Sequence, residues 1–122
     1  MFNKLILFLL LVSGTIYAQK SFFELRTYEL QWGNNAQPLH DYLSEALIPA
    51  LNDNGVETIG AFEHMENHLP KKIYILITYK SITHYANVRK ALMKEGKFLK
   101  AKQKYDTVSQ EEAPYDRYTT SF

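Results

Sequence analysis

The chain has 122 residues and no cysteine, and its 14 lysines and arginines against 13 aspartates and glutamates give a net charge of +1. A fold held together by disulfides is therefore excluded. Such a small net charge provides no strong electrostatic field, which argues against a partner that is nucleic acid or an anionic membrane. Hydrophobic residues make up 46% of the chain, enough for one domain with a modest core.

The first 18 residues have the pattern of an export signal. Lys4 supplies the positive start, residues 5–12 form an apolar run too short to span a bilayer, and Ala18 ends the segment with the small residue typical of a cleavage site. We predict a signal peptide over residues 1–18, a mature domain over residues 19–122, and a secreted or periplasmic location with no stable membrane insertion after cleavage. An uncleaved membrane anchor is the alternative.

Residues 22–30 form the first predicted strand, because large side chains alternate there with a period of two. One face carries three side chains capable of chemistry: Glu24, Arg26 and Tyr28. The other face carries Phe23, Leu25 and Thr27. Aromatic residues on both faces predict a strand that is covered on both sides.

The next segments alternate between helical and strand patterns. Apolar residues at helical spacing predict a helix over residues 39–51, in which Pro49 introduces a kink or break and Asn54-Gly55 provides the stop. Alternation over residues 56–63 predicts a second strand. The third, over residues 72–79, is apolar at nearly every position, which indicates burial of both faces.

The last part of the chain is predicted to contain a second helical region and a fourth strand. Ser81 caps a helix over residues 82–93, a lysine-rich helical segment follows over residues 97–105, and residues 115–122 form the strand. The lysines are typical of a solvated helix face.

The order β-α-β-β-α-β predicts an α+β fold of the ferredoxin-like kind, with a four-stranded antiparallel sheet and both helical regions on one face. The other face then needs a second layer. We expect that layer to come from self-association or from a second module in the same chain, either of which would close a barrel.

Three segments resemble the NIPSNAP family: residues 23–28, residues 47–56 and residues 72–81. The resemblance implies membership of the dimeric α/β-barrel superfamily, which also contains small oxygenases that need no metal or cofactor. Secreted bacterial members of the family look like two modules in tandem, and this chain resembles their first module. It ends inside the strand after which a second module is expected, which is the pattern of a truncated two-module protein.

The candidate ligand-binding residues are the polar face of the first strand together with three aromatic residues. They are Glu24, Arg26, Tyr28, Trp32, Tyr74 and Tyr79. On one strand face successive side chains are about 7 Å apart, so Arg26 can reach either Glu24 or the carboxylate of a ligand. The alternative is a structural ion pair, and the aromatic residues have core packing as their alternative role.

No metal or cofactor is expected. His64 and His68 are four residues apart, but they fall across a strand end and a loop, where this spacing does not bring two imidazoles to one face. The sequence shows no recognisable Ser/His/Asp set and no glycine-rich phosphate loop.

These observations favour an exported NIPSNAP-like domain of unassigned activity that binds a small apolar ligand between two sheets. Two alternatives stay open. One is a cofactor-independent, oxygenase-like enzyme of small molecules that uses Arg26 and Tyr28, and the other is a purely structural interaction module.

The export signal predicts the start of the mature protein. N-terminal sequencing of protein collected from the periplasm or medium should give Gln19 as the first residue. Material that retains Met1 would contradict cleavage and favour the membrane anchor.

Overall fold

The structure is a computed structural model that describes residues 20–109 and 112–122. The predicted signal peptide lies outside these residues. The strands are β1 (Phe22–Glu29), β2 (Thr58–Glu63), β3 (Lys72–Tyr79) and β4 (Arg117–Ser121). The helices are α2 (Gln37–Tyr42), the π-helical segment η1 (Leu43–Leu47), α3 (Ile48–Asp53), α4 (Ile82–Leu92) and α5 (Gly96–Asp106).

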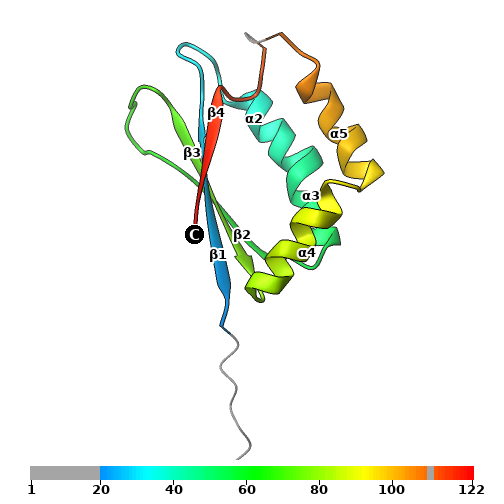
Figure 1. The fold of residues 1–122 in the computed structure, drawn as a ribbon. Helices are drawn as coiled ribbons and strands as arrows, with labels where there is room; N and C mark the ends of the chain where they lie inside the picture. Colours follow the sequence, from blue (N-terminus) through cyan, green and yellow to red (C-terminus); the bar gives the residue numbers. More distant parts are fainter. Residues whose placement is uncertain (1–19, 110–111) are drawn as a thin grey trace, which may run out of the picture.

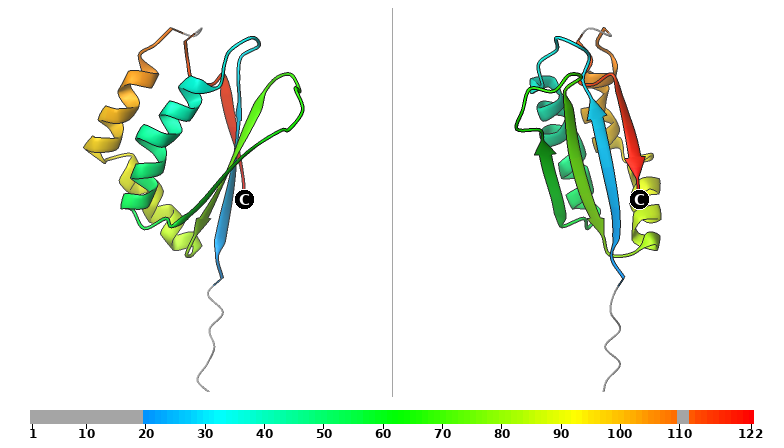
Figure 2. Two further views of the ribbon diagram at one scale, coloured as in Figure 1. Left: turned by 180° about the vertical axis from the view of Figure 1, so that it is seen from behind. Right: turned by 90° about the vertical axis from the view of Figure 1, so that its left-hand side faces the viewer.

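The strands form one antiparallel sheet in the order β2-β3-β1-β4 (Figure 2). All helices lie on the same side of this sheet (Figure 1). The predicted ferredoxin-like α+β fold is therefore confirmed. In the register of the sheet, Arg26 on the central strand β1 lies opposite Ile75 of β3 and Thr120 of β4.

The first helical region is continuous but changes its winding before Pro49. The backbone N–H of Ile48 bonds to the carbonyl of Leu43, five residues back, which is a π-helical bond. Pro49 has no N–H, and in a regular α-helix its ring would clash with the carbonyl of Glu45. The widened turn thus accommodates the predicted break, and the helix ends before Gly55, whose φ of 81° is left-handed.

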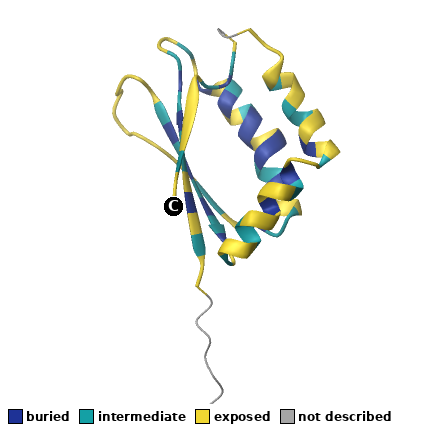
Figure 3. Ribbon diagram, in the orientation of Figure 1, coloured by how far each residue is buried: buried dark blue, intermediate teal, exposed yellow. Residues whose placement is uncertain are grey.

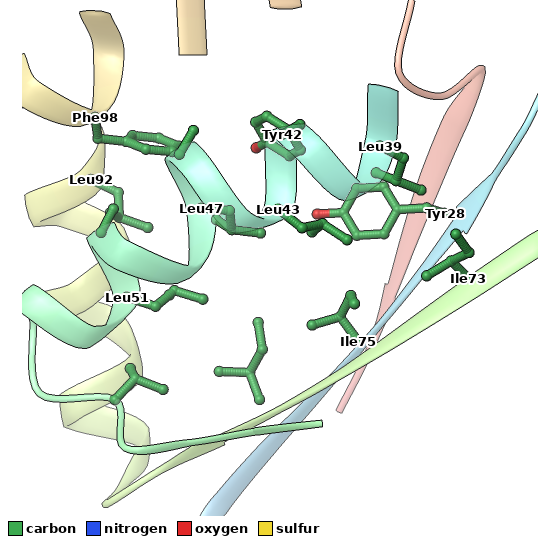
Figure 4. Close-up of a cluster of buried hydrophobic side chains, with 14 of the residues drawn as sticks. Tyr28, Leu39, Tyr42, Leu43, Leu47, Leu51, Ile73, Ile75, Leu92 and Phe98 are labelled. Carbon is green, nitrogen blue, oxygen red and sulfur yellow. The ribbon is translucent and has the colours of Figure 1, made fainter. Parts of the chain in front are cut away.

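The core lies between the sheet and this helix (Figures 3 and 4). Alternate side chains of β3 and one stripe of the helix are at most 4% exposed: Ile73, Ile75, Ile77, Tyr79, Leu39, Leu43, Leu47 and Leu51. The period of two in the strand and the helical period of the facing segment bring these apolar surfaces together.

The second helical region is held by a cap and by ion pairs. The Ser81 hydroxyl accepts a hydrogen bond from the backbone N–H of His84 at 3.0 Å, so the predicted cap is confirmed. Helix α5 packs against η1 and α2, where Lys104 pairs with Glu45. The lysine-rich segment is therefore partly engaged with the first helix as well as with solvent.

The face of the sheet opposite the helices carries an apolar patch over β1, β2 and β3, and no described element covers it. Phe23 is 51% exposed there, Phe62 is 57% exposed, and Leu25 lies beside them on β1. The outward side chains of β3, Tyr74 and Leu76, are only half buried. This exposed patch supports the prediction of a second layer, which stays a prediction.

We propose that a second copy of the chain covers this open face. Leu25→Lys should place a charge in the contact and shift the protein toward a monomer in sedimentation equilibrium at micromolar concentration, with little effect on folding because Leu25 is already 36% exposed. Ile82→Lys is the matched control, because Ile82 is exposed on α4 at the helix side. A monomeric wild-type domain would contradict self-association and leave a second module as the source of cover.

Candidate functional site

The centre of the candidate site is a buried ion pair on β1. Glu24 is 2% exposed, and its Oε1 accepts a hydrogen bond from Arg26 Nε at 2.6 Å. The Oε2 atom accepts one from the Tyr79 hydroxyl at 2.6 Å and a longer one from Arg26 Nη2 at 3.4 Å. Both carboxylate oxygens are thus occupied by donors from β1 and β3.

The two groups that donate to Glu24, Arg26 and Tyr79, keep their ordinary protonation states at neutral pH. Burial lowers the pKa of Arg26, but the hydrogen bond to Glu24 and the neighbouring groups outweigh burial, and the pKa is raised overall. Burial and the hydrogen bond to Glu24 both raise the pKa of Tyr79. At neutral pH the carboxyl group of Glu24 therefore meets a cationic guanidinium and a neutral phenol.

A group of four tyrosines lies beside the pair, and the Arg26 guanidinium is 6.0 Å from the centroid of the Tyr118 ring. The Tyr28 ring lies 4.9 Å from that of Tyr115 and 5.3 Å from that of Tyr118, measured between ring centroids. Tyr42 approaches from the helix, 6.0 Å from Tyr115. Burial raises the pKa of Tyr28 and Tyr42 and raises that of Tyr115 to about 12, so these phenols stay neutral.

A cavity of about 320 Å³ lies beside the pair, between the sheet and the helices. Apolar side chains from the helices, including Leu47, Leu92 and Phe98, form one wall (Figure 4). The other wall comes from β1, β4 and the segment before β4, and includes Tyr28, Tyr115 and Tyr118. The lining also contains the exposed residue Met93 and the cation Arg89, so the cavity opens to solvent along α4.

The structure brings together four of the six predicted site residues: Glu24, Arg26, Tyr28 and Tyr79. The other two are elsewhere. Trp32 is 77% exposed in the turn after β1, and Tyr74 lies on the open face, where its hydroxyl is 2.9 Å from His64 Nε2.

One geometric expectation is wrong. Glu24, Arg26 and Tyr28 face the helices, so they do not face a space between two sheets. Alternation correctly separated the two faces of β1, but aromatic residues on both faces gave no sign of which one the helices cover.

Sequence reasoning missed the part of the site that comes from the helices and the last strand. The main omissions are Tyr42, Arg89, Phe98, Tyr115 and Tyr118. A signal was available for Tyr118, since the ferredoxin-like order pairs the last strand with the first, and the register then places Tyr118 opposite Tyr28.

The histidine-containing loop forms a local network of its own. His64 and His68 lie 5.2 Å apart between ring centroids, and His68 Nε2 is 3.2 Å from the Glu66 carboxylate. In residues 20–109 and 112–122, no three side chains of the metal-binding types converge on one point. Within the same ranges, no helix has the length and apolar character needed to cross a membrane.

Comparison with known proteins places these features in a family. The NIPSNAP family model matches residues 23–115. No match was found among curated proteins.

Solved structures with the same fold include two NIPSNAP family proteins from Agrobacterium tumefaciens. One, of unknown function, is 19% identical with a TM-score of 0.64, and the match covers 86% of this chain and 87% of that one. The other is 13% identical with a TM-score of 0.60 and coverage of 84% and 90%. An uncharacterised NIPSNAP-like domain protein from Burkholderia xenovorans is 17% identical with a TM-score of 0.63 and coverage of 84% and 83%.

Because Glu24 and Arg26 form a buried ion pair, we expect that removing one of them strongly destabilises the fold. Arg26→Ala should lower the free energy of unfolding by about 3 to 5 kcal/mol, because the Glu24 carboxylate would stay buried without its cation. Combining Arg26→Met with Glu24→Gln should recover much of this loss, since the side-chain amide that replaces the carboxylate still accepts from Tyr79. Denaturant unfolding measures both.

The matched control is Arg117→Ala, which removes an exposed pair with Glu29 and should cost about 0 to 1 kcal/mol. An Arg26→Ala domain as stable as wild type would contradict the structural role of the pair.

Proposed function

The chain belongs to the NIPSNAP family, and on that basis we propose that it is a small-molecule-binding module whose ligand occupies the cavity beside Arg26. The cavity itself carries the proposal. Its volume of about 320 Å³ is at the lower end of the range of small-molecule sites, and its walls combine aromatic and aliphatic side chains with several polar and charged groups.

The position of the cavity changes the sequence-based hypothesis, because the proposed ligand lies between the sheet and the helices and not between two sheets. The only charged residues of β1 that point inward, Glu24 and Arg26, border the cavity on the helix side. The space outside the open face is assigned instead to self-association. A ligand with an apolar body and a polar end fits these walls better than a wholly apolar one.

Binding is favoured over the oxygenase-like alternative by the state of Glu24. A reaction that begins by removing a proton from the substrate needs a base that can accept it. Glu24 has both oxygens engaged by Arg26 and Tyr79, and none of the described residues that line the cavity is a histidine. The neighbouring tyrosines have raised pKa values and are poor bases at neutral pH.

The alternative of a purely structural module does not account for the cavity. A domain that serves only for interaction gains nothing from a hollow bordered by a buried ion pair, and such a hollow forfeits packing contacts. We also propose, from residues 1–18, that the module works outside the cytoplasm.

Blocking the cavity should abolish ligand binding. Met93→Trp adds an indole at the solvent-exposed edge of the lining, where Met93 is 67% exposed and folding should tolerate the change. Native mass spectrometry of protein purified without denaturation should show a bound small molecule on the wild type and none on this variant. Met65→Trp is the control, because Met65 is fully exposed in the loop after β2. Wild-type protein that carries no small molecule, and whose melting temperature no compound of a small-molecule library raises, would favour the structural module.

A further inference from the structure

We propose that the ligand is a small aromatic carboxylate, with Arg89 binding its charged group at the opening of the cavity. This inference rests on the proposed function and adds the chemical class of the ligand. It is carried by the distribution of charge around the cavity and by the aromatic character of its walls.

Three cations and one carboxylate line the cavity: Arg26, Arg89, Lys102 and Glu24. Arg26 is neutralised by Glu24, and Lys102 Nζ lies 2.6 Å from the Asp106 carboxylate. Within the part of the chain that the structure describes, Arg89 makes no ion pair. The cavity therefore has an excess of positive charge, centred on Arg89, that an anionic ligand would balance.

Arg89 is also held in place over the opening. Its Nη1 donates to the Tyr85 hydroxyl at 2.9 Å, and its guanidinium lies 5.8 Å from the centroid of the Tyr85 ring. Tyr85 in turn packs edge-on against Tyr79, 5.1 Å away. A guanidinium has five N–H donors, so the bond to Tyr85 leaves donors that can bind a carboxylate in a bidentate manner.

Helical spacing places Arg89 on the same side of α4 as two other residues that line the cavity. Leu92 and Met93 lie three and four residues further along the chain, and both line the cavity. A carboxylate bound by Arg89 would thus leave the body of the ligand directed between the helices and the sheet.

Aromatic rings form a large part of the cavity wall that would contact the body of the ligand. Five line the cavity: Tyr28, Tyr42, Phe98, Tyr115 and Tyr118. Their edge-to-face and tilted arrangement, with Tyr28 and Tyr115 4.9 Å apart, is the one that a further aromatic ring joins favourably. A volume of about 320 Å³ suits a compact ligand of one or two rings.

The test compares two probes of the same shape, naphthalene-2-carboxylate and naphthalene-2-carboxamide, by isothermal titration calorimetry. Wild-type protein should bind the carboxylate more tightly. Arg89→Gln should weaken binding of the carboxylate by about tenfold or more and leave binding of the carboxamide unchanged. Arg89→Lys should retain part of the preference, because it keeps the charge but loses the bidentate geometry.

Arg117→Gln is the charge-matched control, since Arg117 pairs with Glu29 away from the cavity and should leave both probes unaffected. Equal affinities of the two probes, an Arg89→Gln variant with unchanged carboxylate affinity, or a wild type that binds neither probe would overturn the inference. If Met93→Trp removes binding of both probes while Arg89→Gln alters neither, the binding function stands and only the assignment of ligand class fails.

Discussion

The buried carboxylate of Glu24 requires a cation and a hydrogen-bond donor beside it, because an unpaired charge at a position only 2% exposed would be strongly destabilising. Arg26 lies two residues along the same face of β1, and the β1–β3 pairing brings the Tyr79 hydroxyl to the second oxygen. Moving β1 by one residue would exchange its two faces and place the pair on the open side of the sheet. The pair and the register of the central strands are therefore mutually dependent.

The packing of the helices on the sheet explains the position of the cavity. The first helical region covers the core strands, and α5 packs against that helix through η1 and α2. The half of the sheet formed by β1 and β4 therefore faces a hollow lined by Arg26 and Thr120, and Tyr118 stays 48% exposed. Ion pairs such as Lys104 with Glu45 join α5 to the first helical region.

The two faces of the sheet have different chemistry and suit different partners. The helix side combines an ion pair, a group of tyrosines and a positively charged opening, which suits the proposed ligand with an aromatic body and an anionic end. The open side presents Phe23, Leu25 and Phe62, which suits another apolar protein surface. The proposed ligand site and the proposed contact with a second module therefore lie on different surfaces and would not compete.

The sequence by itself determined the local structure and the proximity of Glu24 and Arg26 on one face of β1. Residues 72–79 are a strand with the predicted bounds, Ser81 caps the following helix, and the helix is rewound before Pro49, as local propensities and the chemistry of proline require. Glu24 and Arg26 were predicted to be neighbours because strand alternation fixes their distance regardless of what surrounds them.

Only the tertiary structure decided which face of β1 the helices cover and which distant residues complete the site. Arg89, Phe98 and Tyr118 reach the cavity from two helices and the last strand, and their positions depend on helix packing and strand register over many residues. Local periodicity predicts which side chains share a face of a helix or strand. It does not predict which other element packs against that face, because contacts between elements are set by the packing of the whole core.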